Sequence, residues 1–343
     1  IMSASSSDNK NTPNKNLTIS DVAEALGISK TTVSRAISGK GRIGEETRRK
    51  VLEYIDENNY KPNPMAKGLA DQKTYNICWV IPGDSNVTEL PFFQRCMAGV
   101  CEVTMATNYD ILISLVYEEN ISQLKRIINN KKVDGVILGR TLVDDKSVRF
   151  MKENGVKFVV IGSTPEKDVA QIDNDHFNAC EELTSILVIK GNRRIALIGG
   201  PETHVVNVTR QRGYEEGLRS QGIEPDPDLM FLNNISVDDV ERSVDGALAA
   251  SADCILCMDD KIAYDTVMKL RRDEVRVPEN VKVASFYNSA LLANNQPAIT
   301  TLQYDPKELG NVACRTLLRM IDGEKVEEKT LLSYEVMLKG STQ

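Results

Sequence analysis

The stretch LTISDVAEALGISKTTVSRAISGKGRIGEETRRKVLEYIDENNY, residues 17–60, has the pattern of three short helices joined by turns. Ser20 is a candidate cap of the first helix, because a serine side chain accepts a hydrogen bond from a free amide of the first turn. Gly27 stands where a residue in the left-handed conformation would end that helix. Its apolar stripe consists of Val22, Ala23 and Leu26. The spacing predicts a small helical domain in this part of the chain.

A second helix is expected over residues 30–38, with Ser29 as its cap. Val33 and Ile37 are four residues apart and therefore face the same side, toward the core. The outward positions hold only short hydroxyls and long cations, namely Lys30, Thr31, Thr32, Ser34 and Arg35. Arginine and lysine reach guanine O6 and N7, while hydroxyls bind bases or phosphates. A helix with so little bulk on its outer face fits a DNA major groove.

A third helix is expected over residues 45–57, after Gly39 and Gly41 interrupt the chain. The residues expected to complete the small core are Val51, Leu52 and Ile55. An amphipathic helical bundle without any role in DNA binding would show the same periodicity. The periodicity alone therefore leaves both interpretations open.

The motifs of this stretch resemble the head of the lactose/galactose-repressor family of bacterial transcription regulators, with the pattern T-x-x-D-V-A-x-x-A-G-V-S-x-x-T-V-S-R. Here the motif reads Thr18-Ile19-Ser20-Asp21-Val22-Ala23, Leu26-Gly27-Ile28-Ser29 and Thr32-Val33-Ser34-Arg35, with Leu26 in place of the usual small residue. The resemblance implies base contacts from Lys30, Thr31 and Arg35. It implies phosphate contacts from Thr18, Thr32, Ser34 and Asn63.

Residues 60–69, YKPNPMAKGL, resemble the Y-x-P-N-x-x-A-R-x-L hinge of that family. Pro64 can begin a helix there, but a helix of a turn or two is marginal by itself and would order only against a partner, such as its twin in a dimer on DNA. The resemblance implies that Leu69 is a wedge inserted into a minor-groove base step and that Lys67 replaces the usual arginine. A flexible linker with an isolated leucine is the alternative.

The charge distribution agrees with DNA contact at one end of the chain. Residues 1–75 carry 12 Lys and Arg against 9 Asp and Glu, and the remaining residues carry 30 against 40, so a head of +3 precedes a body of −10. Phosphates would repel the acidic body. The sequence has no apolar run of transmembrane length, and residues 1–16 lack the apolar region of a secretory signal. We expect a disordered tail at 1–16 and a cytoplasmic, nucleoid-associated protein.

The seven cysteines are scattered through apolar segments, as is typical of reduced packing residues. Cys254 and Cys257 form a lone C-x-x-C inside an expected strand, where positions three apart point to opposite faces. The chain has only two histidines, His176 and His204. We therefore expect no metal site and no cofactor.

From residue 75 onward, apolar strands alternate with helical patterns. The expected strands are 76–81, 111–116, 133–138 and 157–161, followed by 194–199, 229–232, 254–257 and 281–286. In the second series, helices are expected near 176–190, 207–220, 236–250 and 260–271. Continuous apolar strands between helices predict an α/β fold of two doubly wound, parallel-sheet subdomains. A ligand would then bind at the carboxyl ends of the strands, in the crevice between the halves.

The body resembles the periplasmic sugar-binding-protein fold that this family uses as its sensor. Supporting motifs are Asp134-Gly135-Val136-Ile137, Arg210-Gln211-Arg212-Gly213-Tyr214 and the closing segment 335–342. The expected organisation is a head at 17–63, a hinge helix at 64–73, a sensor N-subdomain at 74–174 and 305–323, and a C-subdomain at 175–304 and 324–343.

Sugar sites combine an aromatic ring stacked on the pyranose with a charged group that binds paired hydroxyls. By the resemblance, Arg210 is the effector-binding arginine, although a surface arginine near the start of a helix is the alternative. Phe92 or Phe93 is a candidate for the stacking ring, with core packing as the alternative. Arg140 follows the third strand, where a core role is hard to assign.

Two further candidates follow strands of the second series. Asp259 matches a position where the family often has asparagine, and Asp260 is expected to cap the next helix. Tyr287, in the segment 285–288, stands where the family usually has an acid or amide that binds sugar hydroxyls. This departure indicates either an atypical effector or a sugar site in which Tyr287 bonds or stacks.

Taken together, the residues and the resemblance imply a sequence-specific transcriptional regulator, expected to be a repressor, under the control of a small-molecule effector of the carbohydrate class. We expect a homodimer on a pseudo-palindromic operator, and no tetramer because no leucine heptads follow the last strand. A solute-binding protein without a transcriptional role is the alternative. An enzyme is not expected, because neither histidine lies in a recognisable catalytic context and adjacent acids usually cap helices or face solvent.

Overall fold

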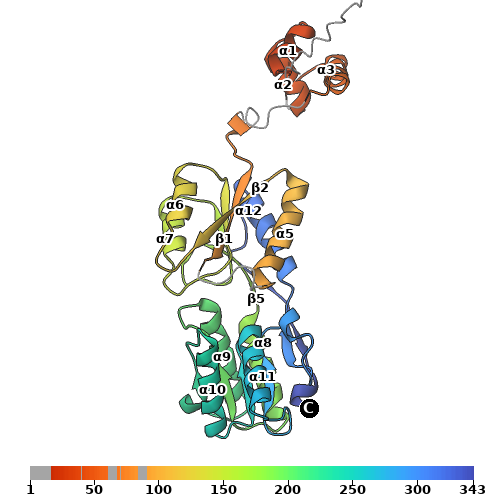
Figure 1. Ribbon diagram of the computed structural model, residues 1–343. Helices are drawn as coiled ribbons and strands as arrows, with labels where there is room; N and C mark the ends of the chain where they lie inside the picture. Colours follow the sequence, from red (N-terminus) through yellow and green to blue (C-terminus); the bar gives the residue numbers. More distant parts are fainter. Residues whose placement is uncertain (1–16, 40, 61–67, 70, 84–90) are drawn as a thin grey trace, which may run out of the picture. The chain divides into compact units, whose positions relative to one another are not determined.

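The computed structural model describes residues 17–39, 41–60, 68–69, 71–83 and 91–343 (Figure 1). The expected tail at 1–16, Asn63 and Lys67 lie outside these residues. Contacts divide the chain into two units, Ile1–Thr74 and Tyr75–Gln343. None of the helices in the described part of the chain is long and apolar enough to cross a membrane.

The first unit contains the three expected helices, α1 (Ile19–Ala25), α2 (Lys30–Ser38) and α3 (Glu45–Glu57). The expected cap Ser20 was wrong, because the cap of α1 is Thr18. The Thr18 backbone N–H donates to the Asp21 carboxylate at 2.7 Å, and the Asp21 N–H donates back to Thr18 Oγ1 at 3.4 Å. This reciprocal pair satisfies two amides at once, which a cap at Ser20 would not.

The core of this unit lies between the three helices. Its buried residues are Val22, Ala23, Val33, Ala36, Val51 and Tyr60. Leu52, expected in the core, is 43% exposed. Adjacent helical positions differ by about 100° around the axis, so Val51 and Leu52 cannot both face inward. Tyr60, which follows α3, contributes to the core instead.

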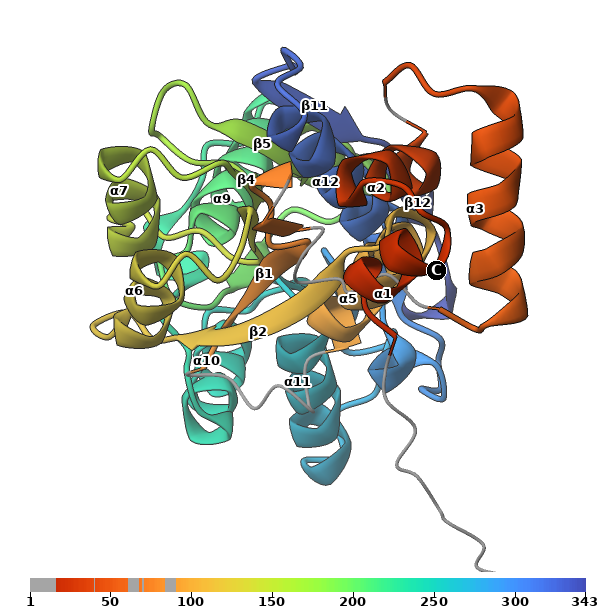
Figure 2. The same cartoon turned by 90° about the horizontal axis from the view of Figure 1, so that it is seen from above.

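The first sheet of the second unit has the strand order β11-β5-β4-β3-β1-β2, and all its pairs are parallel. Its strands are β1 (Asn76–Pro82), β2 (Asp110–Val116), β3 (Gly135–Leu138), β4 (Phe158–Ile161), β5 (Ala170–Asn174) and β11 (Lys329–Leu332). One face packs against α5 (Pro91–Thr107) and α12 (Pro306–Ile321), and the other against α6 (Ser122–Asn129) and α7 (Lys146–Glu153), as Figure 2 shows.

The second sheet has the order β12-β10-β9-β8-β6-β7, parallel except for the pair of β10 with β12. Its strands are β6 (Ile195–Ile198), β7 (Met230–Phe231), β8 (Cys254–Cys257), β9 (Lys282–Ser285), β10 (Thr300–Gln303) and β12 (Glu335–Met337). Its helices are α8 (His176–Ile189), α9 (Val205–Arg219), α10 (Val237–Ala249) and α11 (Asp260–Arg272). Short 3₁₀ turns are η1 (Pro227–Leu229), η2 (Ala290–Leu292) and η3 (Gly340–Thr342). Cys254 and Cys257 belong to the cores on opposite faces of this sheet.

The α/β prediction of two doubly wound subdomains is confirmed, and we call the two sheets with their helices the first and second lobes. One boundary differs from expectation, because β11 pairs with β5 in the first lobe although 324–343 was assigned to the second. The chain thus passes between the lobes at three places, after β5, after β10 and after β11. The Asp175 N–H donates to the Leu332 carbonyl at 3.1 Å, so two of these crossings are bonded to each other.

Glycines bring α9 unusually close to α8. A Cβ built on Gly213 would lie 2.6 Å from the Phe177 carbonyl oxygen, and one on Gly217 would lie 2.6 Å from that of Glu181. Both distances are below any ordinary contact, so only glycine permits this approach. The close packing fixes the position of Arg210, one turn earlier on the same side of α9.

Candidate DNA-binding face and effector site

The outward face of α2 is the candidate DNA-binding surface. Lys30, Thr31, Ser34 and Arg35 are exposed, and α2 contains no acidic residue. Val33 and Ala36 are buried on the opposite side. The helix therefore presents cations and small hydroxyls without a carboxylate that would repel phosphate.

The other candidate phosphate contacts of the head also stabilise helix ends. The Thr32 N–H donates to Ser29 Oγ at 3.0 Å, and the hydroxyls of Thr32 and Ser29 are 2.8 Å apart. The predicted Ser29 cap is thus confirmed. The Thr18 hydroxyl donates to the Asp21 carboxylate at 2.7 Å. Leu69 is 84% exposed, which is unusual for a leucine and leaves its side chain available to a partner.

Arg210 lies in the second lobe as a buried cation that forms no ion pair with a carboxylate of the described residues. Its Nη1 donates to the Met258 carbonyl at 2.7 Å, and its Nε, also buried, has no hydrogen-bond partner among the described residues. Burial raises the pKa of both Asp173 and Asp259, and the charge of Arg210 opposes that rise, so the guanidinium lies within electrostatic reach of both acids. A buried guanidinium with an unused N–H requires an acceptor that the surrounding described residues do not supply.

Five further buried side chains have a polar atom without a hydrogen-bond partner in the described part of the chain, and two of them follow strand ends. The atoms concerned in these two are both amide atoms of Asn174, at the end of β5, and Oδ2 of Asp260, at the start of α11. Both follow the carboxyl end of a strand, where doubly wound folds bind ligands. Neither was recognised from the sequence, because an orphaned polar atom becomes visible only once its neighbours in space are known.

The expected roles of the two adjacent acids are corrected. Asp259 is the cap of α11, since its Oδ1 accepts the Ile262 N–H at 2.8 Å, whereas Asp260 is the first helical residue. Burial and then the charge of Asp260 raise the pKa of Asp259. One oxygen of Asp259 is therefore engaged in capping, and the unpaired carboxylate oxygen belongs to Asp260.

A row of aromatic rings runs beside Arg210. Phe92 meets Tyr287 edge-on at 6.0 Å between ring centroids, and Tyr287 stacks on Tyr304 at 6.2 Å and 14°. Phe92 packs against the cores of both lobes, and Phe93 packs against that of the first. Tyr287 is buried, and burial is the main reason why the pKa of its hydroxyl is raised.

The row ends at a buried polar cluster near the crossings. The ring of His176 lies edge-on to Tyr304 with centroids 4.9 Å apart, and its Nδ1 is 3.2 Å from the Tyr304 hydroxyl. Burial, and then the charge of Arg210, lower the pKa of His176, which is therefore neutral. Burial raises the pKa of Asp173 to about 6, even though the Ser163 hydroxyl donates to its Oδ2 at 2.8 Å.

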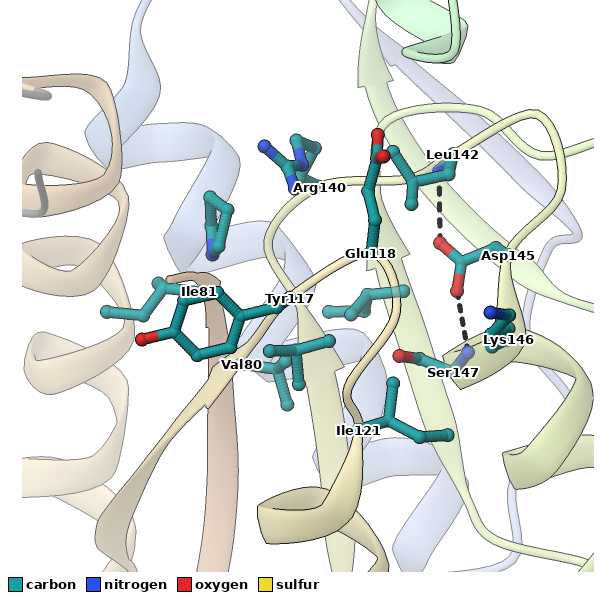
Figure 3. A pocket seen from close by; sticks show the side chains of 13 residues that line it. Val80, Ile81, Tyr117, Glu118, Ile121, Arg140, Leu142, Asp145, Lys146 and Ser147 are labelled. Carbon is teal, nitrogen blue, oxygen red and sulfur yellow. Dashed lines mark hydrogen bonds between the residues drawn. The ribbon is translucent and has the colours of Figure 1, made fainter. Parts of the chain in front are cut away.

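Arg140 lines a separate pocket at the carboxyl ends of β1, β2 and β3 (Figure 3). The Tyr117 and Glu118 side chains lie on the same rim, and Asp145 forms the opposite wall. Asp145 accepts the N–H groups of Leu142, Ser147 and Val148 at 2.8–3.0 Å. Burial raises the pKa of Asp145, and the charge of Arg140 opposes that rise.

Comparison with known proteins agrees with this geometry. Residues 18–63 match the family description of bacterial regulatory proteins of the lacI family, and residues 184–342 match a periplasmic binding protein-like domain. The chain thus carries a LacI-family DNA-binding domain at residues 18–63, followed by a periplasmic-binding-protein-like domain. It is a DNA-binding transcriptional regulator, with a helix-turn-helix head and a two-lobed body.

Relatives and solved structures cover nearly the whole chain. The regulator RegA of Clostridium saccharobutylicum is 29% identical over 333 residues, which cover 94% of this chain and 98% of RegA. Catabolite control protein A of Staphylococcus xylosus is 28% identical over 332 residues, covering 95% and 99%. A complex of the regulator CelR with cellobiose has a TM-score of 0.72 at 27% identity, covering 95% of this chain and 99% of CelR. A Lac repressor dimer bound to operator and an anti-inducer has a TM-score of 0.79 at 22% identity, covering 96% and 99%, and shows the same fold.

Proposed function

We propose that this LacI-family regulator is a repressor whose operator binding is controlled by a sugar or sugar derivative bound between its two lobes. The observation that supports this proposal most directly is that the buried guanidinium of Arg210 has an N–H without an acceptor among the described residues. Leaving such a group unpaired costs about 1–3 kcal/mol or more, and a bound ligand would remove that cost.

The orphaned atoms favour a polyhydroxyl ligand. Arg210 Nε needs an acceptor, Asp260 Oδ2 needs a donor, and the Asn174 amide needs one of each. A sugar hydroxyl donates and accepts at once, and the Tyr287 ring offers an apolar wall to a pyranose. CelR, at 27% identity, was solved with cellobiose, which supports this ligand class. Phe92, Phe93, Arg140 and Asp259 stay candidate effector contacts, with Asp260 and Asn174 added.

For the head, we propose base contacts from Lys30, Thr31 and Arg35, and phosphate contacts from Thr18, Thr32, Ser34 and Asn63. Leu69 is the proposed minor-groove wedge, with Lys67 beside it. The exposure of the α2 face and of Leu69 supports these assignments.

We propose a homodimer on a pseudo-palindromic operator. β2 is an edge strand of the first sheet, and the side chains of Ile113, Leu115 and Tyr117 on or beside it are exposed. An uncovered apolar edge strand invites self-association unless something covers it. A second copy of the chain is the proposed cover; the Lac repressor, whose fold this chain shares, was solved as a dimer.

The proposal includes a cytoplasmic, nucleoid-associated location and the lack of enzymatic activity. The regulator relatives support both. A solute-binding protein without a transcriptional role is disfavoured by the lacI-family head at 18–63.

The decisive experiment is a thermal-shift screen of mono- and disaccharides on the full chain, followed by operator binding with each hit. Operator DNA is obtained by selection from random sequence. Arg210→Ala should abolish the shift, because losing a charged hydrogen bond costs about 1.5–3 kcal/mol, or roughly 10- to 150-fold in affinity. Arg212→Ala is the matched control, since this arginine lies on the same helix over the Phe177 ring. An undiminished shift in Arg210→Ala would remove Arg210 from the site.

A further inference from the structure

Two loops from different lobes are paired through their backbones. The Val143 N–H donates to the Thr203 carbonyl at 2.8 Å, and the Val205 N–H donates to the Thr141 carbonyl at 3.3 Å. Leu142 and His204 form an antiparallel bridge between these two bonds. Segment 141–143 follows β3 of the first lobe, and segment 203–205 leads into α9 of the second.

A side-chain bond reinforces the pairing. The Thr203 hydroxyl donates to the Glu118 carboxylate at 3.1 Å. Glu118 follows β2 of the first lobe and lines the pocket that contains Arg140 (Figure 3). The second lobe is thus bonded to two different loops of the first.

Each loop is held firmly within its own lobe. In the first lobe, Asp145 accepts the Leu142 N–H at 3.0 Å, and the Thr141 hydroxyl donates to the Ser163 carbonyl at 2.6 Å. In the second, the Glu202 N–H donates to Asn233 Oδ1 at 3.0 Å, and Asn233 Nδ2 donates back to Glu202 at 2.8 Å. Because neither loop is free to follow the other, a relative movement of the lobes must break the pairing.

The pairing lies away from the crossings between the lobes. β3 is two strands from β5 in the first sheet, and β6, which leads to α9, is three strands from β10 in the second. At a strand spacing of about 4.8 Å, these separations are about 10 Å and 14 Å. A relative rotation of about 15° at the crossings would then move the loops apart by roughly 3 Å, which is enough to break hydrogen bonds of this length.

We propose that segments 141–143 and 203–205 form a latch that holds the two lobes closed, and that opening of the crevice releases both backbone bonds together. Lobe closure by this latch does not depend on which effector binds. It adds to the proposed function a specific element whose state reports whether the crevice is open or closed.

Val205→Pro removes one latch bond while preserving the helix. Val205 is the first residue of α9, where proline is well tolerated because that amide has no partner within the helix. His204, at φ −88° and ψ 123°, already has the extended conformation that proline requires of the preceding residue. The substitution therefore removes the N–H that donates to the Thr141 carbonyl, and the backbone at the start of α9 can keep its conformation.

Val237→Pro is the matched control. Val237 is the first residue of α10, and it follows Ser236 at φ −103° and ψ 166°. No hydrogen bond from its amide is found among the described residues. Both variants thus make the same change at the same helical position of the same lobe, and only one of them affects the latch.

The measurement is hydrogen exchange by mass spectrometry on the full-length protein without added ligand. We expect the peptide covering 141–145 to exchange at least about tenfold faster in Val205→Pro, because Val143 loses its paired partner when the latch opens. Peptides around Asn174 and Asp260, at the crevice, should exchange faster as well. Val237→Pro should match the unmodified protein in all three regions.

Unchanged exchange of 141–145 in Val205→Pro, with α9 still protected, would overturn the latch. If Val205→Pro instead loses protection throughout α9, Thr203→Val decides. It removes only the hydroxyl bonded to Glu118 and should also accelerate exchange of 141–145, whereas no acceleration there would overturn the proposal. If the sugar screen gives no hits, that result contradicts the proposed carbohydrate effector. The latch is tested separately, because the exchange experiment uses no ligand.

Discussion

The close packing of α9 on α8 leads to a quantitative prediction for Gly213→Ala. The new Cβ would lie 2.6 Å from the Phe177 carbonyl oxygen and 3.2 Å from the Glu181 backbone nitrogen. Main-chain atoms inside a helix cannot rotate out of the way. α9 would have to withdraw by roughly 0.8 Å to restore an ordinary contact of about 3.4 Å.

The expected cost follows from two opposing effects. Overpacking of this kind costs about 1–3 kcal/mol, and two main-chain obstacles place Gly213→Ala near the upper end. Replacing a helical glycine by alanine returns about 1 kcal/mol. The net loss is about 2 kcal/mol, which corresponds to a fall in Tm of about 4–8 °C for a domain of this size. The same withdrawal would lengthen the 2.7 Å bond from Arg210 to Met258 toward the limit of a hydrogen bond.

Thermal unfolding by circular dichroism, with Gly246→Ala as the control, tests this reasoning. A Cβ on Gly246 also meets an atom at 2.6 Å, but that atom belongs to the partly exposed Phe231 ring, which can move. We expect the Tm of Gly246→Ala to stay within about 2 °C, because the gain in helix propensity offsets a small rearrangement. Equal changes in Tm for the two variants would refute the claim that the main-chain contact fixes the position of α9.

Two further predictions concern the head and the buried acid. Arg35→Ala should weaken discrimination at one base pair per half-site by about 1–3 kcal/mol, measured as the ratio of operator to scrambled-DNA affinity; an unaltered ratio would exclude a base contact. Asp173→Asn should stabilise the protein increasingly as the pH rises from 4 to 7. Burial raises the pKa of Asp173 in the folded state to about 6, so the unfolded chain ionises first and stability is lost between about pH 4 and 6. The full effect is at most about 3 kcal/mol. Urea unfolding at both ends of this range checks it, and a constant difference between variant and parent would contradict the assignment.

Helices and strands could be predicted correctly from the sequence where local signals were enough to define them. The ranges of α2 and α3 were correct because caps, glycines and apolar spacing agree there. β5 and β10 were not predicted as strands, because the segments AQIDN and TTLQ carry polar residues in buried positions. Several of those side chains bond to neighbouring segments, as Gln171 does to Thr164, Asp173 to Ser163 and Thr300 to Thr342. The usual link between burial and apolar character therefore fails at these strands.

The candidate site was predictable only in part for a related reason. Arg210 was found through its motif, but the motif does not reveal its unused N–H. Asp259 and Asp260 differ by one position, and which of them caps α11 depends on where the helix begins, a boundary that sequence patterns locate poorly. The side-chain amide of Asn174 has no partner among the described residues, which is a property of the neighbours that folding brings around it.

The three crossings between the lobes have a mechanical consequence. Asp175 is bonded to Leu332, and His176 lies within hydrogen-bond distance of Tyr304, so the three connections are tied together where they pass from one lobe to the other. Because these three connecting segments are bonded to one another, we expect them to bend together more readily than they twist. We therefore expect the lobes to move mainly about one axis through the three connections, so that closing is favoured over twisting. A ligand that binds anywhere in the crevice then drives the same movement, so differently shaped effectors would transmit one common signal.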